Sequence, residues 1–153
     1  MVLVVGVITD SDHADQFSRL LSDLISLQSF DQICSLDVVV LHNGGSPGVL
    51  ERMIVRYREC GLTIFLASEK QQVEDAQRGV FGGGFIRPVG RAPIGPARTM
   101  LQAYVTRVAS QRHGAIAWIL DDDCTLENLF LTGGPRQSLP HSSRRSRKCI
   151  RLE

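Results

Sequence analysis

The chain has 153 residues, of which 43% are hydrophobic and 22% are charged, a composition typical of a soluble globular protein. This length predicts a single domain with a substantial core, and no apolar stretch is long enough to predict a transmembrane segment. Residues 1–135 hold 11 Lys/Arg against 15 Asp/Glu, whereas residues 136–153 hold six basic residues and one acidic residue. The charge of the main body therefore excludes an extended nucleic-acid surface there.

The four cysteines form no CxxC pair and show no metal-finger spacing. Cys34 and Cys60 are expected to be core or near-core thiols, which favours a reducing compartment. The apolar start, residues 1–8, lacks the charged flank of a signal peptide. These features predict a cytoplasmic location.

Strands and helices alternate through the first half of the chain. Short β-branched or apolar runs predict strands at residues 2–8, 36–41 and 62–67. Apolar residues at helical spacing predict helices over about 15–28 and from Pro47 until Gly61. This β-α-β-α-β order predicts an α/β fold with a doubly wound, mostly parallel sheet and helices on both faces.

A long glycine- and arginine-bearing loop, residues 79–96, follows a polar segment at 69–78 whose pattern is compatible with a helix. It is not a P-loop, because no Gly-Lys-Ser/Thr follows the glycines. A further helix is expected to begin near Pro96 or Ala97, which would place Arg98 in its first turn, where free N–H groups favour an anion. The alternative for Arg98 is a surface ion pair.

The most informative stretch is the apolar run 115–120, which leads directly into three acids. Its length and lack of helical periodicity predict a buried strand, apolar on both faces, and ligands bind at the carboxyl ends of such strands. Alternate residues of an extended chain point to the same side, so Asp121 and Asp123 are candidates to share one divalent cation, with phosphate oxygens completing the shell. Alternatively, the acids cap a helix starting near Cys124 or lie solvated in a turn.

The end of the chain differs in character. Residues 125–131 are expected to form one more short helix. Residues 132–153 are rich in Ser and Arg and poor in apolar side chains, a composition that predicts a disordered basic tail, suited to contacts with acidic partners. The predicted organisation is therefore a domain over residues 1–131 and a tail over 132–153.

Four segments in this order resemble the nucleotide-binding half of a GT-A glycosyltransferase of the broad family 2 kind. They are a strand ending in Thr9-Asp10, a strand ending in Leu-His-Asn-Gly-Gly-Ser, the helix opening Ile-Gly-Pro-Ala-Arg, and Trp-Ile-Leu-Asp-Asp-Asp. The resemblance covers about residues 2–131. It implies a Rossmann-like α/β/α sandwich that binds a UDP- or GDP-linked sugar with Mn²⁺ or Mg²⁺ and transfers the sugar to an acceptor that the sequence does not identify.

The resemblance also implies roles for individual residues. Asp121 to Asp123 would be the DxD element, with Asp121 and Asp123 as metal ligands and Asp123 the direct one. Thr9 and the turn at Asn43 would line the base pocket, and Arg98 would face the nucleotide or its diphosphate. The full set of nucleotide-binding residues implied is Thr9, Asp10, His42, Asn43, Arg98, Asp121 and Asp122.

Two features depart from the family pattern. His42 stands where the family usually has the Asp that recognises a uracil edge, which weakens the expectation of uridine. No residue after Asp123 matches the acceptor half of the family, so no catalytic base is nominated, and this chain is expected to transfer sugar slowly or not at all.

Two other functions remain open. The first is a non-catalytic relative that keeps the fold as a nucleotide-binding or interaction module. The second is a phosphoryl-transfer or receiver-like α/β domain built on the acid cluster. Such domains use a partner lysine, and the only lysines here are Lys70 and Lys148, so this alternative is weaker.

Overall fold

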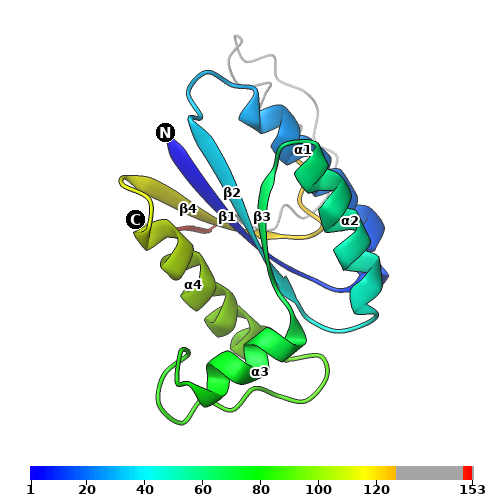
Figure 1. Cartoon of the computed structure of the whole chain (residues 1–153), viewed down its shortest axis with the longest axis vertical. Coiled ribbons are helices and arrows are strands. Elements are labelled where there is room, and N and C mark those ends of the chain that lie inside the picture. The colour runs from blue at the N-terminus through cyan, green and yellow to red at the C-terminus, as the bar shows by residue number, and fades with distance from the viewer. Residues whose placement is uncertain (127–149, 153) are drawn as a thin grey trace, which may run out of the picture.

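A computed structural model of the chain describes residues 1–126 and 150–152. Parallel strands and helices alternate along it (Figure 1). The elements are β1 (Val2–Thr9), the 3₁₀ turn η1 (Ser11–His13), α1 (Ala14–Gln28), β2 (Ser35–His42), α2 (Pro47–Glu59), β3 (Thr63–Ala67), α3 (Glu69–Gln77), α4 (Ile94–Ser110), β4 (Ala115–Asp121) and β5 (Ile150–Leu152).

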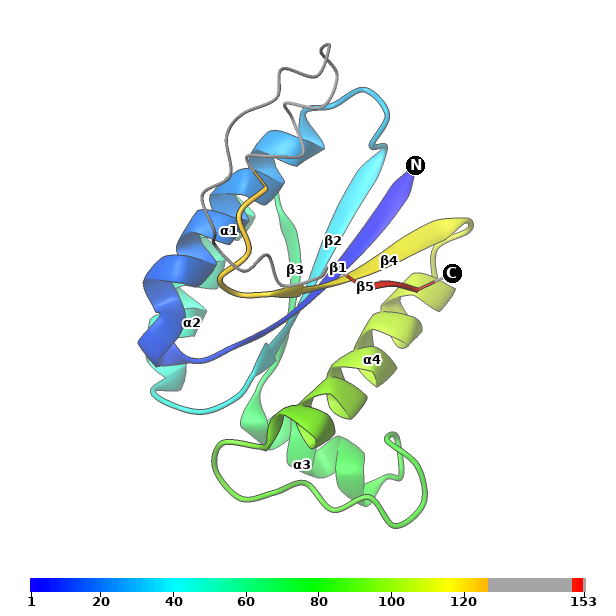
Figure 2. The ribbon, with the colours of Figure 1, turned by 180° about the vertical axis from the view of Figure 1, so that it is seen from behind.

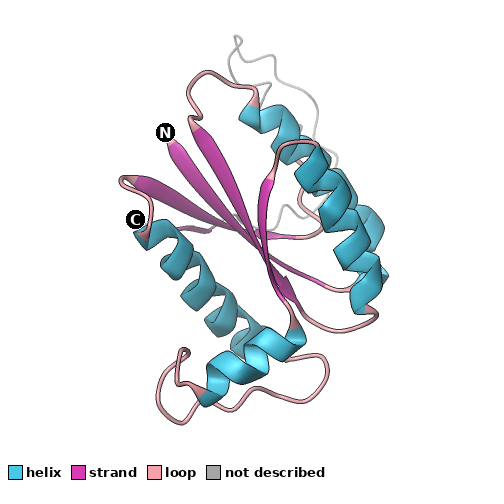
Figure 3. Ribbon diagram, viewed as in Figure 1, coloured by secondary structure: helices cyan, strands magenta, loops and turns pink. Residues whose placement is uncertain are grey.

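The sheet has the strand order β3-β2-β1-β4-β5. Strands β1 to β4 are all parallel, and β5 pairs antiparallel with β4. Helices cover both faces, with α1 and α2 on one side and α4 on the other (Figures 1 and 3). The predicted α/β class, with a mostly parallel sheet in a Rossmann-like arrangement, is confirmed.

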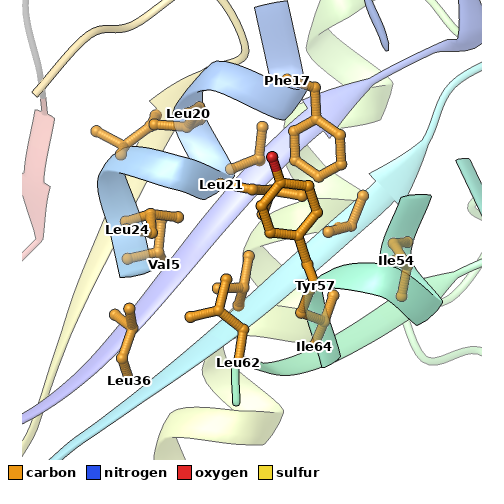
Figure 4. Close-up of a cluster of buried hydrophobic side chains, with 14 of the residues drawn as sticks. Val5, Phe17, Leu20, Leu21, Leu24, Leu36, Ile54, Tyr57, Leu62 and Ile64 are labelled. Atoms are coloured by element: carbon orange, nitrogen blue, oxygen red, sulfur yellow. The ribbon is translucent and has the colours of Figure 1, made fainter. Parts of the chain in front are cut away.

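One core lies between the sheet and the helix pair α1–α2 (Figure 4). The alternate residues Leu3, Val5 and Val7 of β1 point to this side, as the period of two in a strand requires. The Tyr57 ring joins the cluster, while its hydroxyl group donates to the Ser18 carbonyl oxygen at 2.7 Å. The apolar stripe of α1 supplies Phe17, Leu20, Leu21, Leu24 and Leu27.

The opposite core lies between the sheet and α4, which contributes Met100, Leu101 and Tyr104 among others. Gly6 of β1 faces this helix. A Cβ atom at Gly6 would lie 2.5 Å from Cγ2 of Val105, so the glycine lets α4 pack directly onto the central strand. This packing fixes the helix whose first turns reach the carboxyl edge of the sheet.

Within residues 1–121 the structure corrects the expected start of one helix, the burial of one strand and the burial of two cysteines. Helix α4 begins at Ile94, earlier than expected, because Pro96 occupies its third position, where a missing N–H costs nothing. Strand β4 is present but only half-buried along most of its length: Leu120 belongs to the buried core, whereas Ile116 and Trp118 are partly buried and pack against it. Cys34 and Cys60 are exposed and do not belong to the core.

The remaining expectations concern the C-terminal region. The short helix expected at 125–131 and most of the expected tail, 132–153, lie outside the described residues. Of the expected helix, residues 125 and 126 are described, and they are not helical. Of the expected tail, Ile150–Leu152 is described and forms β5, which pairs with β4 (Figure 2). No helix in the described part of the chain is long and apolar enough to cross a membrane.

Candidate functional site

The candidate site lies where the parallel strands end. From β1 the chain moves outward to β2 and β3, and it then returns through α4 to place β4 on the other side of β1. The direction of winding therefore reverses between β1 and β4. In open α/β sheets, ligands bind at the carboxyl ends of the strands at such a switch point.

A direct hydrogen bond joins the two strand ends at this point. Thr9 closes β1, and its Oγ1 donates to Oδ2 of Asp122 at 3.0 Å. The two residues are 113 positions apart in the sequence. The structure thus brings together two of the residues expected from the sequence to bind nucleotide.

Asp10, the next residue after β1, organises a group of polar contacts. Its Oδ1 accepts hydrogen bonds from the backbone N–H groups of Asp12 and His13 and lies 2.8 Å from Nδ1 of His13. Its Oδ2 accepts a hydrogen bond from Nη2 of Arg91. Burial by itself would raise the pKa of Asp10, but the His13 and Asp12 hydrogen bonds and the Arg91 charge outweigh it, so the pKa is lowered.

The turn after β2 packs tightly against the turn after β1. Gly44 and Gly45 have φ values of 112° and 82°, a region that favours glycine. A Cβ atom at Gly45 would lie 2.0 Å from Oγ of Ser11, and the same Oγ accepts the backbone N–H of Ser46 at 2.9 Å. The Gly-Gly pair is therefore required for the two strand ends to meet.

His42 and Asn43 are both buried and use their side chains inside the protein. Nε2 of His42 lies 2.8 Å from the carbonyl oxygen of Gly44, so this nitrogen carries the proton and donates within its own turn. The Asn43 amide forms two hydrogen bonds with the backbone of Ala92, accepting its N–H at 2.8 Å and donating to its carbonyl oxygen at 3.1 Å. Asn43 thereby anchors the loop 79–93 to the carboxyl edge.

The three acids end β4 and form the turn after it. Asp121 is the last residue of β4, and its carbonyl oxygen accepts the N–H of Cys124 at 3.0 Å. Asp122 is half-buried and Asp123 is exposed. No helix begins at Cys124, so the acids are not helix caps in the described part of the chain.

Arg98 lies further along α4 than expected. It is the fifth residue of the helix and hence outside the first turn, which corrects the expectation that it sits among the free N–H groups. Its Nη2 lies 3.8 Å from Oδ1 of Asp121, and both side chains are partly exposed. Arg98 therefore joins the acid cluster through the type of surface ion pair that the sequence left open.

Negative charge exceeds positive charge around the strand ends. Burial raises the pKa of Asp122, the Thr9 hydrogen bond and His13 lower it, and the nearby charges of Asp10 and Asp123 raise it again. The edge carries five carboxylates against three basic groups, so two negative charges remain even with histidine protonated. These groups are Asp10, Asp12, Asp121, Asp122 and Asp123 against His13, Arg91 and Arg98.

A divalent cation would offset the two negative charges that remain at this edge. Within the described residues, no three His, Cys, Asp or Glu side chains converge closely enough to hold a metal ion. The two carboxylates expected as ligands, Asp121 and Asp123, would therefore need phosphate oxygens or water to complete a coordination shell.

Two site residues were missed by the sequence reasoning, His13 and Arg91. His13 lies in the cap-rich turn after β1, and its spacing of three from Asp10 is a signal for a contact within one turn. Arg91 belongs to the loop already noted for its arginines, but nothing local indicates which arginine of that loop reaches Asp10.

Comparisons with protein-family models, with curated proteins and with solved structures find no match for this chain.

Proposed function

We propose that this chain binds a nucleoside-diphosphate sugar together with Mn²⁺ or Mg²⁺ and serves as the donor-binding part of a glycosyltransferase. The observation that carries the proposal is the hydrogen bond between Thr9 and Asp122, which joins the ends of β1 and β4 at the switch point of the sheet. The ligand would lie at this edge, where α/β sheets bind nucleotides.

The charge at the edge supports a metal-bound diphosphate as the ligand. Asp121 and Asp123 would hold the cation, which would offset the excess of carboxylates. When bound, such a cation neutralises the charge that develops on a diphosphate leaving group as the bond to the sugar breaks. Arg98, already paired with Asp121, would add a second positive group beside the leaving phosphates.

The buried side chains define a different role for the turn after β2. His42 and Asn43 are buried, and Nε2 of His42 and the Asn43 amide are engaged in hydrogen bonds to Gly44 and Ala92, so these contacts hold the turn and the loop 79–93 in place. We therefore assign base recognition to the exposed backbone around this turn and assign no base specificity to His42. No described residue is assigned as the catalytic base.

Nucleotide titration tests the proposal. Isothermal titration calorimetry with UDP and GDP, each with Mn²⁺ and with EDTA, is expected to show affinity at least tenfold higher with the metal. Uridine and guanosine serve as controls, because they lack the diphosphate and should bind without metal dependence. Failure of both diphosphates to bind in either buffer would contradict the proposal and leave the interaction-module alternative.

A further inference from the structure

One buried carboxylate holds two basic side chains at the carboxyl edge. The Asp10 side chain is 9% exposed and uses both of its oxygens. One oxygen faces Nδ1 of His13 and two backbone N–H groups, and the other accepts from Arg91. Asp10 therefore fixes the orientation of a histidine next to it and of an arginine 81 residues away.

The same two basic side chains remain open to solvent. The side chain of His13 is 43% exposed and that of Arg91 is 52% exposed. Since Nδ1 of His13 faces Asp10, its Nε2 lies on the other side of the ring. Arg91 contacts Asp10 and Asp12 through the same nitrogen, Nη2, and its other guanidinium donors take no part in these two contacts.

Neighbouring backbone holds the arginine in place. A Cβ atom at Gly44 would lie 3.3 Å from Cβ of Arg91 and 3.6 Å from its Nε, so the side chain runs along the glycine turn after β2. The next residue, Ala92, is anchored through its backbone to Asn43. The backbone next to Arg91 is therefore held by Asn43, and the Arg91 side chain packs along the turn at Gly44.

We infer that His13 and Arg91, oriented by Asp10, form a phosphate-binding pair for the diphosphate of the bound ligand. The inference rests on the proposed function for the nature of that ligand. The guanidinium plane suits phosphate oxygens because it presents several N–H donors in a fixed geometry, and a protonated imidazole adds a second charged donor. Asp10 is a positioning residue in this site.

The pair lies beside the acids expected to hold the metal. The charge of Asp122 raises the pKa of His13, and the charge of His13 lowers the pKa of Asp122. A hydrogen bond from Thr9, the last residue of β1, holds Asp122 beside the strand that precedes Asp10. A diphosphate at this edge would therefore meet the cation at the acids and the two basic side chains at the end of β1. Arg98 lies on the β4 side, next to Asp121.

The alternative is that the contacts of Asp10 with His13 and Arg91 only attach the loop 79–93 to the end of β1 and bind no ligand. Both roles predict some loss of stability when the contacts are removed, so thermal midpoints do not separate them. Affinity for a free phosphate compound does, because a purely structural pair makes no contact with it.

The test is calorimetric titration of the full chain with inorganic pyrophosphate in metal-free buffer at pH 6. The variants are His13→Gln and Arg91→Gln, with His113→Gln and Arg56→Gln as exposed matched controls away from the carboxyl ends of the strands. Each site variant is expected to weaken pyrophosphate binding at least fivefold, and each control less than twofold. Arg91→Lys keeps the charge but loses the planar geometry, so it should give an intermediate affinity.

Each result has a distinct meaning. Unchanged pyrophosphate affinity in both site variants, or no binding by the wild-type chain at millimolar pyrophosphate, would overturn the inference. Metal-dependent UDP or GDP binding that is indifferent to both substitutions would also overturn it while leaving the proposed function intact. Pyrophosphate binding that depends on the pair, in a chain that binds no nucleotide, would support the pair and contradict the proposed function. Circular dichroism of every variant checks that the fold is retained.

Discussion

The Oγ1 atom of Thr9, at the end of β1, donates a hydrogen bond at 3.0 Å to Oδ2 of Asp122, the first residue after the neighbouring strand β4. Thr9 is buried, and its strand is paired with β4 up to the preceding residue, where Ile8 lies opposite Asp121. The bond therefore extends the pairing of the two strands by one side-chain contact and sets where the turn after β4 lies.

Thr9→Val tests this contact, because valine fills the same space but cannot donate. Loss of the bond should lower the free energy of unfolding by about 1 kcal/mol, since its acceptor is partly hydrated. The pKa of Asp122 should rise further, because the Thr9 hydrogen bond lowers it in the wild-type protein. Urea denaturation and carboxyl NMR titration measure the two effects. Thr63→Val, at an exposed position on β3, is the control and should change neither.

Asn43→Ala should release the loop 79–93 from the carboxyl edge. The substitution leaves the N–H and carbonyl oxygen of Ala92 without their side-chain partner in a buried position, which costs about 2–4 kcal/mol for the two groups together. Hydrogen exchange at the Ala92 amide should accelerate by at least tenfold. Gln111→Ala removes an exposed amide at the end of α4 and should alter neither quantity. Slow exchange at Ala92 in the Asn43 variant would show that other contacts hold the loop.

Asp123→Ala tests the metal assignment. The side chain is exposed and lies beside other acids, so its removal should leave stability in metal-free buffer unchanged or slightly higher, because like-charge repulsion falls. The effect of Mn²⁺ on UDP or GDP affinity should disappear. The matched variant is Asp31→Ala, which removes an exposed acid from the loop before β2. An unaltered response to Mn²⁺ in the Asp123 variant would exclude this residue as a metal ligand.

His13 should titrate above its usual value of 6.5. The hydrogen bond to Asp10 raises its pKa first, the charges of Asp10 and Asp122 raise it further, and partial burial and Arg91 oppose the shift. A raised folded-state pKa means that the His13 contribution to stability is fully present below about pH 6.5 and is lost as the pH rises through the folded-state pKa. Asp10 has a lowered pKa, so its contribution is present above about pH 3.8 and is lost as the pH falls through the folded value.

Proton NMR of the His13 ring measures the first effect directly. Asp10→Asn should bring the pKa of His13 down towards 6.5 and flatten the pH dependence of the unfolding free energy above pH 6.5. A His13 pKa at or below 6.5 in the wild-type protein would contradict the contact with Asp10.

Much of the fold follows from local patterns in the sequence. Apolar runs of strand length and helical spacings of apolar residues predicted β1 to β4, α1 and α2 at nearly their observed positions, because these periodicities are set by the geometry of each element alone. The acid run was recognised for the same reason, since Asp121 to Asp123 directly follow an apolar strand. The start of α4 was misplaced because Pro96 fits several positions of a first turn.

The contacts that define the site were decided by tertiary structure. Thr9 meets Asp122 because β4 returns beside β1, and Arg91 meets Asp10 because Asn43 anchors the loop at Ala92. The sequence by itself determined which residues end the strands and that their ends share one edge. Which of them touch depends on strand order and on how a long loop crosses that edge, and these arise from packing between segments some 50 to 110 residues apart, which no local periodicity encodes.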